Sequence, residues 1–233
     1  MERSGNTDAS KYEIIEQIGK GSFGKVHKIR RKQDGKILVW KEINYGKMSE
    51  REKQLLVSEV NILRELRHPN ITRYYDRVID KEKAQLYIVM EFCAGGDLAQ
   101  IIRKRKRQLR ENPSQPDTNA YVPEEMVWKV LAQLTLALLE CHRRKEGNKI
   151  LHRDLKPGNV FFDADENVKL GDFGLSRVMG DESVFAYTHV GTPYYMSPEQ
   201  IQEQRYNEKS DIWSAGCCLY EMACLKAPFE ATN

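Results

Sequence analysis

The hydrophobic pattern changes along the chain, and its first part has the short apolar runs of β-strands. From Tyr12 to Ile43 such runs are separated by glycines and by the pair Asp34-Gly35, which is typical of a hairpin. Two more runs, at residues 72–79 and 85–91, predict two further strands. The first part is therefore expected to be rich in β-structure.

One helix is expected within this first part. Apolar residues recur at helical spacing over residues 49–67, and His68-Pro69 ends the pattern because proline disfavours helical backbone before it. The residues that define the stripe are Leu56, Val60, Leu63 and Leu66.

The second part, from Gly96 onward, has a mainly helical pattern. A short helix starts at Leu98, a Pro-rich and polar loop is expected over 111–120, and Pro123 opens a longer helix at its first turn. Another apolar helix is expected over 207–225. The buried face of the Pro123 helix is predicted to hold Val127, Val130, Leu131, Leu134 and Leu138.

Composition narrows the class of protein. The 233 residues are 40% hydrophobic and 30% charged, as in globular proteins, and the formal charge of +3 gives no reason to expect nucleic-acid binding. The five cysteines contain no Cys-x-x-Cys pair, which favours thiols in a reducing compartment over a disulfide framework. No apolar segment is long enough to predict a membrane span, and the polar residues 1–11 do not resemble a secretory signal. We therefore expect an intracellular protein with no membrane partner.

A strongly basic run extends from Arg103 to Arg110. Such a run can be a docking or nuclear-targeting patch, or part of a nucleic-acid site with salt-sensitive binding. It can also be the solvated end of a helix, and this interpretation is favoured because the net charge is small.

A glycine-rich turn is the first candidate for chemistry. Gly19-Lys20-Gly21-Ser22-Phe23-Gly24 would let backbone N–H groups approach phosphate oxygens. The same spacing fits a dinucleotide-binding turn or a plain tight turn. A strand pattern, not a helix, follows the glycines, which disfavours the dinucleotide version.

Lys41 lies in an apolar strand pattern, where an inward-pointing ammonium group needs a partner. Glu59, on the expected helix, is the candidate, and the pair would present Lys41 to phosphates. Glu50, Glu52 and Glu65 lie nearby, so the alternative is that Glu59 is an ordinary exposed glutamate.

The most specific signal is the run from His152 to Asn159, followed by Asp172-Phe173-Gly174. Asp154 is the candidate base for an attacking hydroxyl, and Lys156 would steady a phosphoryl group. Asn159 and Asp172 would hold Mg²⁺. An isolated Asp-Phe-Gly can be a surface turn, but the two motifs at this separation indicate phosphoryl transfer.

From Tyr12 to the C-terminus, these motifs resemble those of the eukaryotic protein kinases. Lys156 and the segment from Gly191 to Tyr195 resemble the serine/threonine class. Residues 86–98, 194–200 and 206–213 resemble the NIMA-related kinases, the never-in-mitosis family. The resemblance implies an α+β, bilobal fold.

The implied domains are a disordered lead-in at 1–11, a β-rich N-lobe with one helix and a hinge at 12–93, and a mainly helical, incomplete C-lobe at 94–233.

The resemblance also implies an ATP site and its residues. Met90 would be the gatekeeper, Glu91 and Cys93 would offer backbone hydrogen bonds to adenine, and Asp97 would approach the ribose. The set implied to bind ATP is Ile18, Gly19, Lys20, Gly21, Ser22, Phe23, Gly24, Val26, Val39, Lys41, Met90, Glu91, Cys93, Asp97 and Phe161.

Other implied roles concern regulation and support. Asp211 would brace the catalytic loop, and Thr192 would lie in the substrate groove. Thr188 is the candidate phosphorylation site, since a phosphate there could pair with Arg153. An unmodified Thr188, or modification of Ser183 instead, is the alternative.

The implied function is transfer of the γ-phosphate of Mg-ATP to Ser or Thr hydroxyls of protein substrates, in mitotic, centrosomal or ciliary regulation. The expected location is the cytoplasm, with the centrosome and the nucleus as alternatives.

The chain ends soon after the Asp211 helix, whereas the resemblance implies further helices, an arginine partner for Glu199 and a tail that mediates dimerisation. Apolar side chains near Trp213 and Leu219 are thus expected to be uncovered. The alternative function is a catalytically impaired nucleotide-binding scaffold.

Overall fold

The computed structural model describes residues 8–21, 24–111, 120–143, 149–172 and 194–229. The chain divides into two compact units. Of the described residues, unit 1 holds those up to Arg67 and those of Thr72–Phe92, and unit 2 holds His68–Ile71 and those from Cys93 onward.

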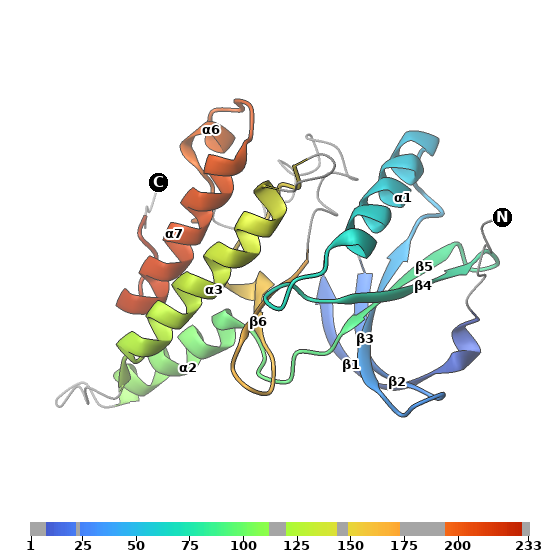
Figure 1. Cartoon of the computed structure of the whole chain (residues 1–233), viewed down its shortest axis with the longest axis horizontal. Coiled ribbons are helices and arrows are strands. Elements are labelled where there is room, and N and C mark those ends of the chain that lie inside the picture. Colours follow the sequence, from blue (N-terminus) through green and yellow to red (C-terminus); the bar gives the residue numbers. More distant parts are fainter. Residues whose placement is uncertain (1–7, 22–23, 112–119, 144–148, 173–193, 230–233) are drawn as a thin grey trace. The chain divides into compact units, whose positions relative to one another are not determined.

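Unit 1 contains a five-stranded antiparallel sheet and one long helix (Figure 1). The strand order is β1-β2-β3-β5-β4. The strands are β1 (Tyr12–Gly21), β2 (Gly24–Arg31), β3 (Ile37–Asn44), β4 (Tyr74–Asp80) and β5 (Gln85–Glu91). The strands predicted from the apolar runs are therefore present, and the Asp34-Gly35 turn joins β2 to β3.

One face of the sheet carries an aromatic-rich core. Trp40 of β3 lies at its centre, with the ring of Tyr87 4.6 Å away and that of Tyr12 6.2 Å away between centroids. Since side chains alternate along a strand, these residues share a face that does not include Lys41. The buried members of the cluster are Tyr12, Ile29, Leu38, Trp40, Val78, Tyr87 and Val89.

The helix α1 (Glu50–Glu65) begins with a capping box in which Ser49 accepts from the Glu52 amide and Glu52 accepts from the Ser49 amide. Leu56 and Val60 are buried on its inner side, as the stripe predicted. The helix ends at Leu66, whose backbone is extended, just before His68-Pro69.

Unit 2 is mainly helical, and α3 and α7 pack side by side (Figure 1). Its elements are α2 (Leu98–Glu111), α3 (Glu124–His142), the 3-10 turn η3 (Pro157–Asn159), the hairpin strands β6 (Val160–Phe162) and β7 (Val168–Leu170), α6 (Pro198–Ile201) and α7 (Glu208–Cys224). Asn207 caps the start of α7, and Leu225 ends it with a left-handed backbone. None of the helices in the described ranges is long and apolar enough to cross a bilayer.

The basic run from Arg103 to Arg110 continues α2. Lys106 points to α7, where its ammonium group lies 2.7 Å from Glu221 Oε1, and Arg107 pairs with Glu111 at 3.6 Å along the helix. The run thus has the intrahelical and interhelical partners of an ordinary helix end.

Three details differ from the sequence predictions. Residues 9–11, placed in the disordered lead-in, form the 3-10 turn η1 (Ala9–Lys11) with Asp8 as its cap. Leu131, predicted to be buried, is exposed. The inward stripe of α3 runs instead through Val130, Leu134, Ala137, Leu138 and Cys141, and Leu131 lies about 100° around the helix from Val130.

The third difference concerns His68–Ile71, which the sequence placed in the N-lobe but which belongs to unit 2. Asn70 explains the difference because it hydrogen-bonds to β7: its Nδ2 donates to the Val168 carbonyl at 3.1 Å, and its carbonyl accepts from the Leu170 amide at 2.8 Å. Such long-range backbone pairing has no local signal.

Apolar side chains of α7 are partly uncovered, as expected. Trp213 is 37% exposed although its ring stacks on Phe229, with centroids 5.6 Å apart and planes 4° apart. Leu219 is intermediate in burial.

The aromatic core generates a stability prediction. Replacing the fully buried Leu38 with alanine should lower the free energy of unfolding by about 2–5 kcal/mol because it leaves a cavity. Urea denaturation followed by tryptophan fluorescence measures the change. Ile14→Ala, on an exposed side chain of β1, is the matched control and should move the midpoint little. Equal effects of the two substitutions would contradict the burial of Leu38 in this core.

Candidate active site

The sheet in unit 1 brings four predicted ATP-site residues to one face. Val26 pairs with Lys41 across β2 and β3, and Val39 pairs with Met90 across β3 and β5. Directly paired residues share a face, as do residues two apart on a strand, so Val26, Val39, Lys41 and Met90 all lie opposite the Trp40 core. An apolar surface next to a lysine can receive a flat base whose chain of phosphates extends toward the ammonium group.

The glycine-rich turn joins β1 to β2 through Gly21 and Gly24, with Ser22 and Phe23 outside the described residues. Gly24 has a φ of +148°, and a Cβ there would lie 2.0 Å from the carbonyl oxygen of Glu42. This position therefore requires glycine for strand packing. A Cβ at Gly19 would meet only Val26 at 3.7 Å, an ordinary contact, so packing does not explain that glycine.

Lys41 is only 4% exposed. Burial of an ammonium group is costly unless it is paired, so its position in an apolar strand fits the predicted anchoring role. The predicted partner, Glu59, is part of α1, but its side chain lies outside the described part of the chain, and the pair stays a prediction.

In unit 2, the segment after Cys93 is bound to β6. The Gly95 amide donates to the Phe162 carbonyl and the Phe162 amide donates to the Gly96 carbonyl, each at 2.9 Å. A Cβ on Gly95 would lie 2.7 Å from that of Phe162, so this close approach requires glycine. The result is an isolated bridge between Asp97 and Phe161, which brings the predicted ribose and adenine residues together.

Asp97 also has a structural role that the sequence did not indicate. Its Oδ1 accepts from the Gln100 amide at 2.8 Å and its Oδ2 from Gln100 Nε2 at 2.7 Å, so it caps the start of α2. A ribose hydroxyl would share this carboxylate with the helix.

The three polar residues of the catalytic motif converge on one another. Asp154 Oδ2 lies 2.7 Å from Lys156 Nζ and 3.2 Å from Asn159 Nδ2, and the same Nδ2 donates to the Asp154 carbonyl at 2.6 Å. The Asp154 side chain is 44% exposed. It is therefore a fixed carboxylate that a hydroxyl group can reach.

Asp172 is tied to the same loop through its neighbour Gly171. The Gly171 amide donates to the Asn159 carbonyl at 3.0 Å, and the Gly171 carbonyl is 2.8 Å from His152 Nε2. Since a carbonyl oxygen only accepts, Nε2 carries the proton. Asp172 itself has a left-handed φ of +57°, a conformation that aspartate tolerates better than most residues.

Asp211 hydrogen-bonds to the backbone of the loop that precedes Asp154. Its buried carboxylate on α7 accepts from the His152 amide at 2.9 Å and the Arg153 amide at 3.0 Å. His142 Nε2 at 2.7 Å and the Tyr206 hydroxyl also donate to it. The predicted brace is thus present, and it supports Arg153 in a left-handed backbone with a φ of +67°.

The charge state of Asp211 follows from these contacts. Burial is the largest influence and by itself raises the pKa of the carboxyl. The hydrogen bonds from His142, Tyr206 and the His152 amide, with the electrostatic interaction with His152, outweigh it, so the pKa lies below its usual 3.8. The same carboxylate, together with burial, raises the pKa of Tyr206 far above its ordinary value.

The segment that begins at Tyr194 is anchored to α7. The Tyr195 hydroxyl donates to Glu221, Ser214 Oγ donates to the Tyr195 carbonyl at 2.7 Å, and Ser210 Oγ donates to Glu199. Thr188 and Thr192, predicted for phosphorylation and for the substrate groove, lie outside the described residues.

The side chains fit Mg²⁺ in their chemistry. The nitrogen of the Asn159 amide is committed to Asp154, so its oxygen is the atom available to a cation. Carboxylate and amide oxygens are ligands that Mg²⁺ accepts, and this ion commonly uses one or two protein groups with waters and phosphates. A cluster of three acidic, histidine or cysteine ligands is absent from the described residues, and a shared phosphate–metal site does not require one.

Sequence reasoning missed His142, Tyr206 and Glu221 as supports. His142 lies 69 residues from Asp211, and no local pattern connects them. The one available signal was a histidine at the end of a buried helical stripe, where a lone polar residue needs a partner.

The Asp211 network generates a second prediction. Asp211→Asn should lower the free energy of unfolding at pH 7 by about 3 kcal/mol, since an amide places a donor against the surrounding donors. The pKa of Asp211 is lower in the folded than in the unfolded chain. Its ionised carboxylate therefore contributes fully to the free energy of unfolding above pH 3.8, and this contribution is lost as the pH falls toward the folded pKa. Urea denaturation at pH 7 and pH 3 measures the effect. The difference in midpoint between wild type and variant should be smaller at pH 3. Glu125→Gln, on the exposed first turn of α3, is the control and should change neither midpoint appreciably.

Comparison with known proteins agrees with this geometry. Residues 12–233 match the protein kinase domain family. The chain is 60% identical to the serine/threonine-protein kinase Nek2 of Homo sapiens over 96% of its own length and 48% of that relative. It is 58% identical to a probable nek2 kinase of Dictyostelium discoideum, over 95% of the chain and 50% of the relative.

A third relative is the G2-specific protein kinase nimA of Emericella nidulans, at 46% identity over 96% of this chain and 34% of that protein. The chain therefore spans about half the length of the Nek2 relatives it matches, or less. The converging Asp154, Asn159 and Asp172 segments and the shared sequence together show that the chain belongs to the protein kinase family, in its NIMA-related branch.

Proposed function

We propose that the chain is an ATP-dependent protein serine/threonine kinase that transfers a phosphoryl group to Ser or Thr hydroxyls. The observation that carries the proposal is the convergence of Asp154, Lys156 and Asn159, with Gly171 bonding Asp172 to the same loop. A phosphoryl transfer needs a base at the hydroxyl, a cation near the moving group and oxygen ligands for metal, and these residues match the three needs.

The chain's own residues would act as follows. Asp154 accepts a hydrogen bond from the substrate hydroxyl and takes its proton, while Lys156 offsets charge on the phosphoryl group. Asn159 and Asp172 would hold Mg²⁺, and Lys41 would orient the phosphates. Bound Mg-ATP supplies the phosphoryl group and neutralises charge between its phosphates.

Asp211 contributes by positioning. It fixes the amides of His152 and Arg153, so the backbone immediately before Asp154 cannot rotate freely. A carboxylate held in place loses little conformational entropy when the hydroxyl arrives.

The cell-cycle part of the proposal rests on the relatives and on the family resemblance. The relative in Emericella nidulans carries the name G2-specific protein kinase, which favours a role in mitotic regulation. A centrosomal or ciliary role, a location in the cytoplasm, centrosome or nucleus, and dimerisation through a tail beyond these residues rest on the family resemblance. Imaging of the tagged protein through the cell cycle tests the location.

The catalytic assignment predicts a loss of transfer without a loss of binding. Asp154→Asn should lower the rate of phosphate transfer from labelled ATP to a generic Ser/Thr protein substrate by about 10²–10⁴-fold, since the base is lost. The affinity for ATP, measured by calorimetry, should stay close to that of wild type. Asp165→Asn, on the exposed turn between β6 and β7, is the matched control and should retain activity.

Transfer by Asp154→Asn at the wild-type rate would overturn the assignment. ATP binding by the wild-type chain with no transfer, even with the phosphomimetic Thr188→Glu, would favour the nucleotide-binding scaffold instead.

Thr188 is proposed as a regulatory phosphorylation site. A phosphate there would pair with Arg153, whose backbone is already fixed by Asp211. Thr188→Ala should lower transfer by about tenfold, and mass spectrometry after incubation with Mg-ATP should find phosphate at Thr188 in the wild type. Ser183→Ala is the control. Phosphate confined to Ser183, with Thr188→Ala fully active, would contradict the proposal.

A further inference from the structure

Three cationic side chains of unit 1 gather around the ring of Tyr75, which lies on β4. Arg31 Cζ lies 5.8 Å from the centroid of this ring, Lys36 Nζ lies 4.7 Å from it and Arg73 Cζ lies 5.2 Å from it. None of these residues belongs to the set predicted for ATP, Mg²⁺ or the substrate hydroxyl.

The tyrosine ring explains how like charges are held together. Tyr75 is half-buried and packs against the Trp40 cluster, so its ring has a fixed place on the sheet. A cation over an aromatic ring is attracted by the negative charge of the ring face. Lys36 Nζ also donates to the Tyr75 hydroxyl at 2.8 Å, which fixes the position of this ammonium group.

The charges of these cations are not all compensated. Arg31 has a carboxylate partner, since its Nε lies 2.9 Å from Asp34 Oδ1 and its Nη2 lies 2.5 Å from Asp34 Oδ2. Glu91 accepts from the backbone amide of Arg73, at 3.0 Å. Among the described residues, the side chains of Lys36 and Arg73 form no ion pair.

The two cations without a carboxylate partner lie at the surface. Lys36 and Arg73 are both exposed, so a ligand can reach them from solvent. The Lys36 ammonium group has three N–H donors, one of which Tyr75 uses, and the Arg73 guanidinium group has five. An anion that enters between them gains several charge-assisted hydrogen bonds and reduces their mutual repulsion.

A phosphate monoester matches this demand better than a carboxylate does. Its charge of about −1.5 to −2 at pH 7 balances two cations, and its three free oxygens can accept from both of them. A carboxylate has only one charge and two oxygens, and it would leave one of the two cations uncompensated.

We propose that Lys36 and Arg73 form a docking site for a phosphorylated residue of a partner protein, with Tyr75 holding the two cations in position. The two side chains bind the phosphate oxygens, and Arg31 adds positive charge nearby although it is paired with Asp34. This binding function goes beyond phosphoryl transfer and does not depend on it.

An anionic membrane fits these residues less well. Membrane binding by basic side chains commonly uses about four to eight of them. Here the cations gather over a single ring, and the carboxylate of Asp34 lies among them. The arrangement therefore suits one phosphate group of a protein.

A titration of the ¹⁵N-labelled 233-residue chain, followed by two-dimensional NMR, tests the proposal. The probe is a five-residue peptide with one phosphoserine between glycines and alanines. We expect saturable shifts of the amides of residues 35–37 and 73–76, with a Kd of about 0.1–1 mM, as for a few charge-assisted hydrogen bonds. The same peptide with serine should cause no shifts, and the peptide with aspartate should bind at least about fivefold more weakly.

Two substitutions remove the proposed phosphate ligands, and each has a matched control. Lys36→Gln and Arg73→Gln should each raise the Kd about fivefold or more. Lys32→Gln, exposed near the same turn, and Arg51→Gln, exposed on α1, remove the same charge without a contact to Tyr75 and should stay within about twofold. Thermal melts check that each variant is folded, and Lys36→Gln alone decides the test if Arg73→Gln unfolds.

Several results would overturn the proposal. These are no saturable shifts up to about 10 mM peptide, equal binding of the aspartate peptide, equal effects of Lys32→Gln and Lys36→Gln, or shifts confined to the surroundings of Arg153. Sedimentation with phosphatidylserine vesicles that Lys36→Gln abolishes, with no response to the phosphopeptide, would assign the cations to a membrane instead. Because the titration involves no ATP, its outcome is independent of the transfer experiment.

Discussion

The buried carboxylate of Asp211 is the interaction on which the catalytic loop depends. It accepts four hydrogen bonds, two of them from consecutive backbone amides, and it lies on α7, which packs along α3. An isolated buried charge would be costly, and only complete hydrogen bonding makes the ionised form the stable one. The loop before Asp154 is therefore as rigid as the helix that carries Asp211.

Asp154 and Asp211 are carboxylates in different environments, and they differ in burial and in the hydrogen bonds that they can still accept. Asp211 is fully buried and its acceptor capacity is used by the protein. Asp154 is nearly half exposed and is held by Lys156 and Asn159 on one oxygen, Oδ2, so its other oxygen can still accept a hydrogen bond from outside the protein. Had the two environments been exchanged, the Asp154 carboxylate would be buried and closed to an incoming hydroxyl group.

Much of this arrangement could be predicted from the sequence because it depends on residues that are close together in the chain. The strand that carries Lys41, the stripe of α1 and the spacing from Asp154 to Asp172 are all short-range signals. What could not be predicted depends on long-range pairing: His142 with Asp211, Lys106 with Glu221, and Asn70 with β7. The prediction that Leu131 is buried was wrong for a related reason. The apolar spacing predicts the helix, but the width of its buried stripe depends on which other elements pack against α3.

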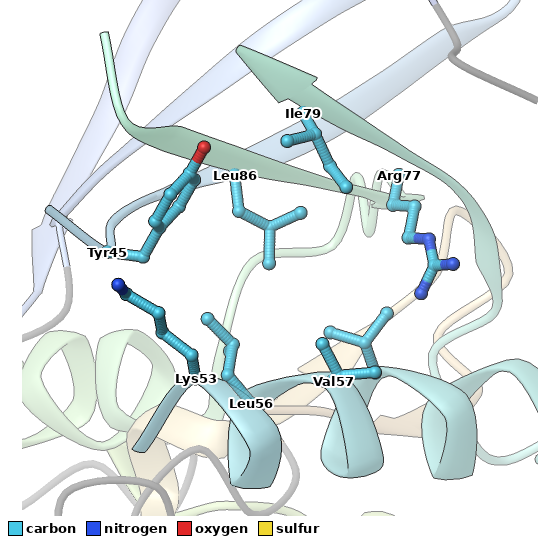
Figure 2. A pocket seen from close by; sticks show the side chains of 8 residues that line it. Tyr45, Lys53, Leu56, Val57, Arg77, Ile79 and Leu86 are labelled. Atoms are coloured by element: carbon cyan, nitrogen blue, oxygen red, sulfur yellow. The ribbon is translucent and has the colours of Figure 1, made fainter. Parts of the chain in front are cut away.

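The two faces of the sheet in unit 1 are packed by different kinds of side chain, and a pocket lies beside α1 on the face opposite the Trp40 core (Figure 2). On the Trp40 face, Tyr12 packs edge-on against Trp40 and Tyr87 lies tilted against it, so large rigid side chains fill the space. On the other face, valine and leucine side chains of α1 meet side chains of β4 and β5, and the pocket lies between them. The edge strand β4, on which Ile79 is exposed, also has fewer neighbours to close that room. The face of the sheet that carries Lys41 thus also carries, further along its strands, the pocket beside α1.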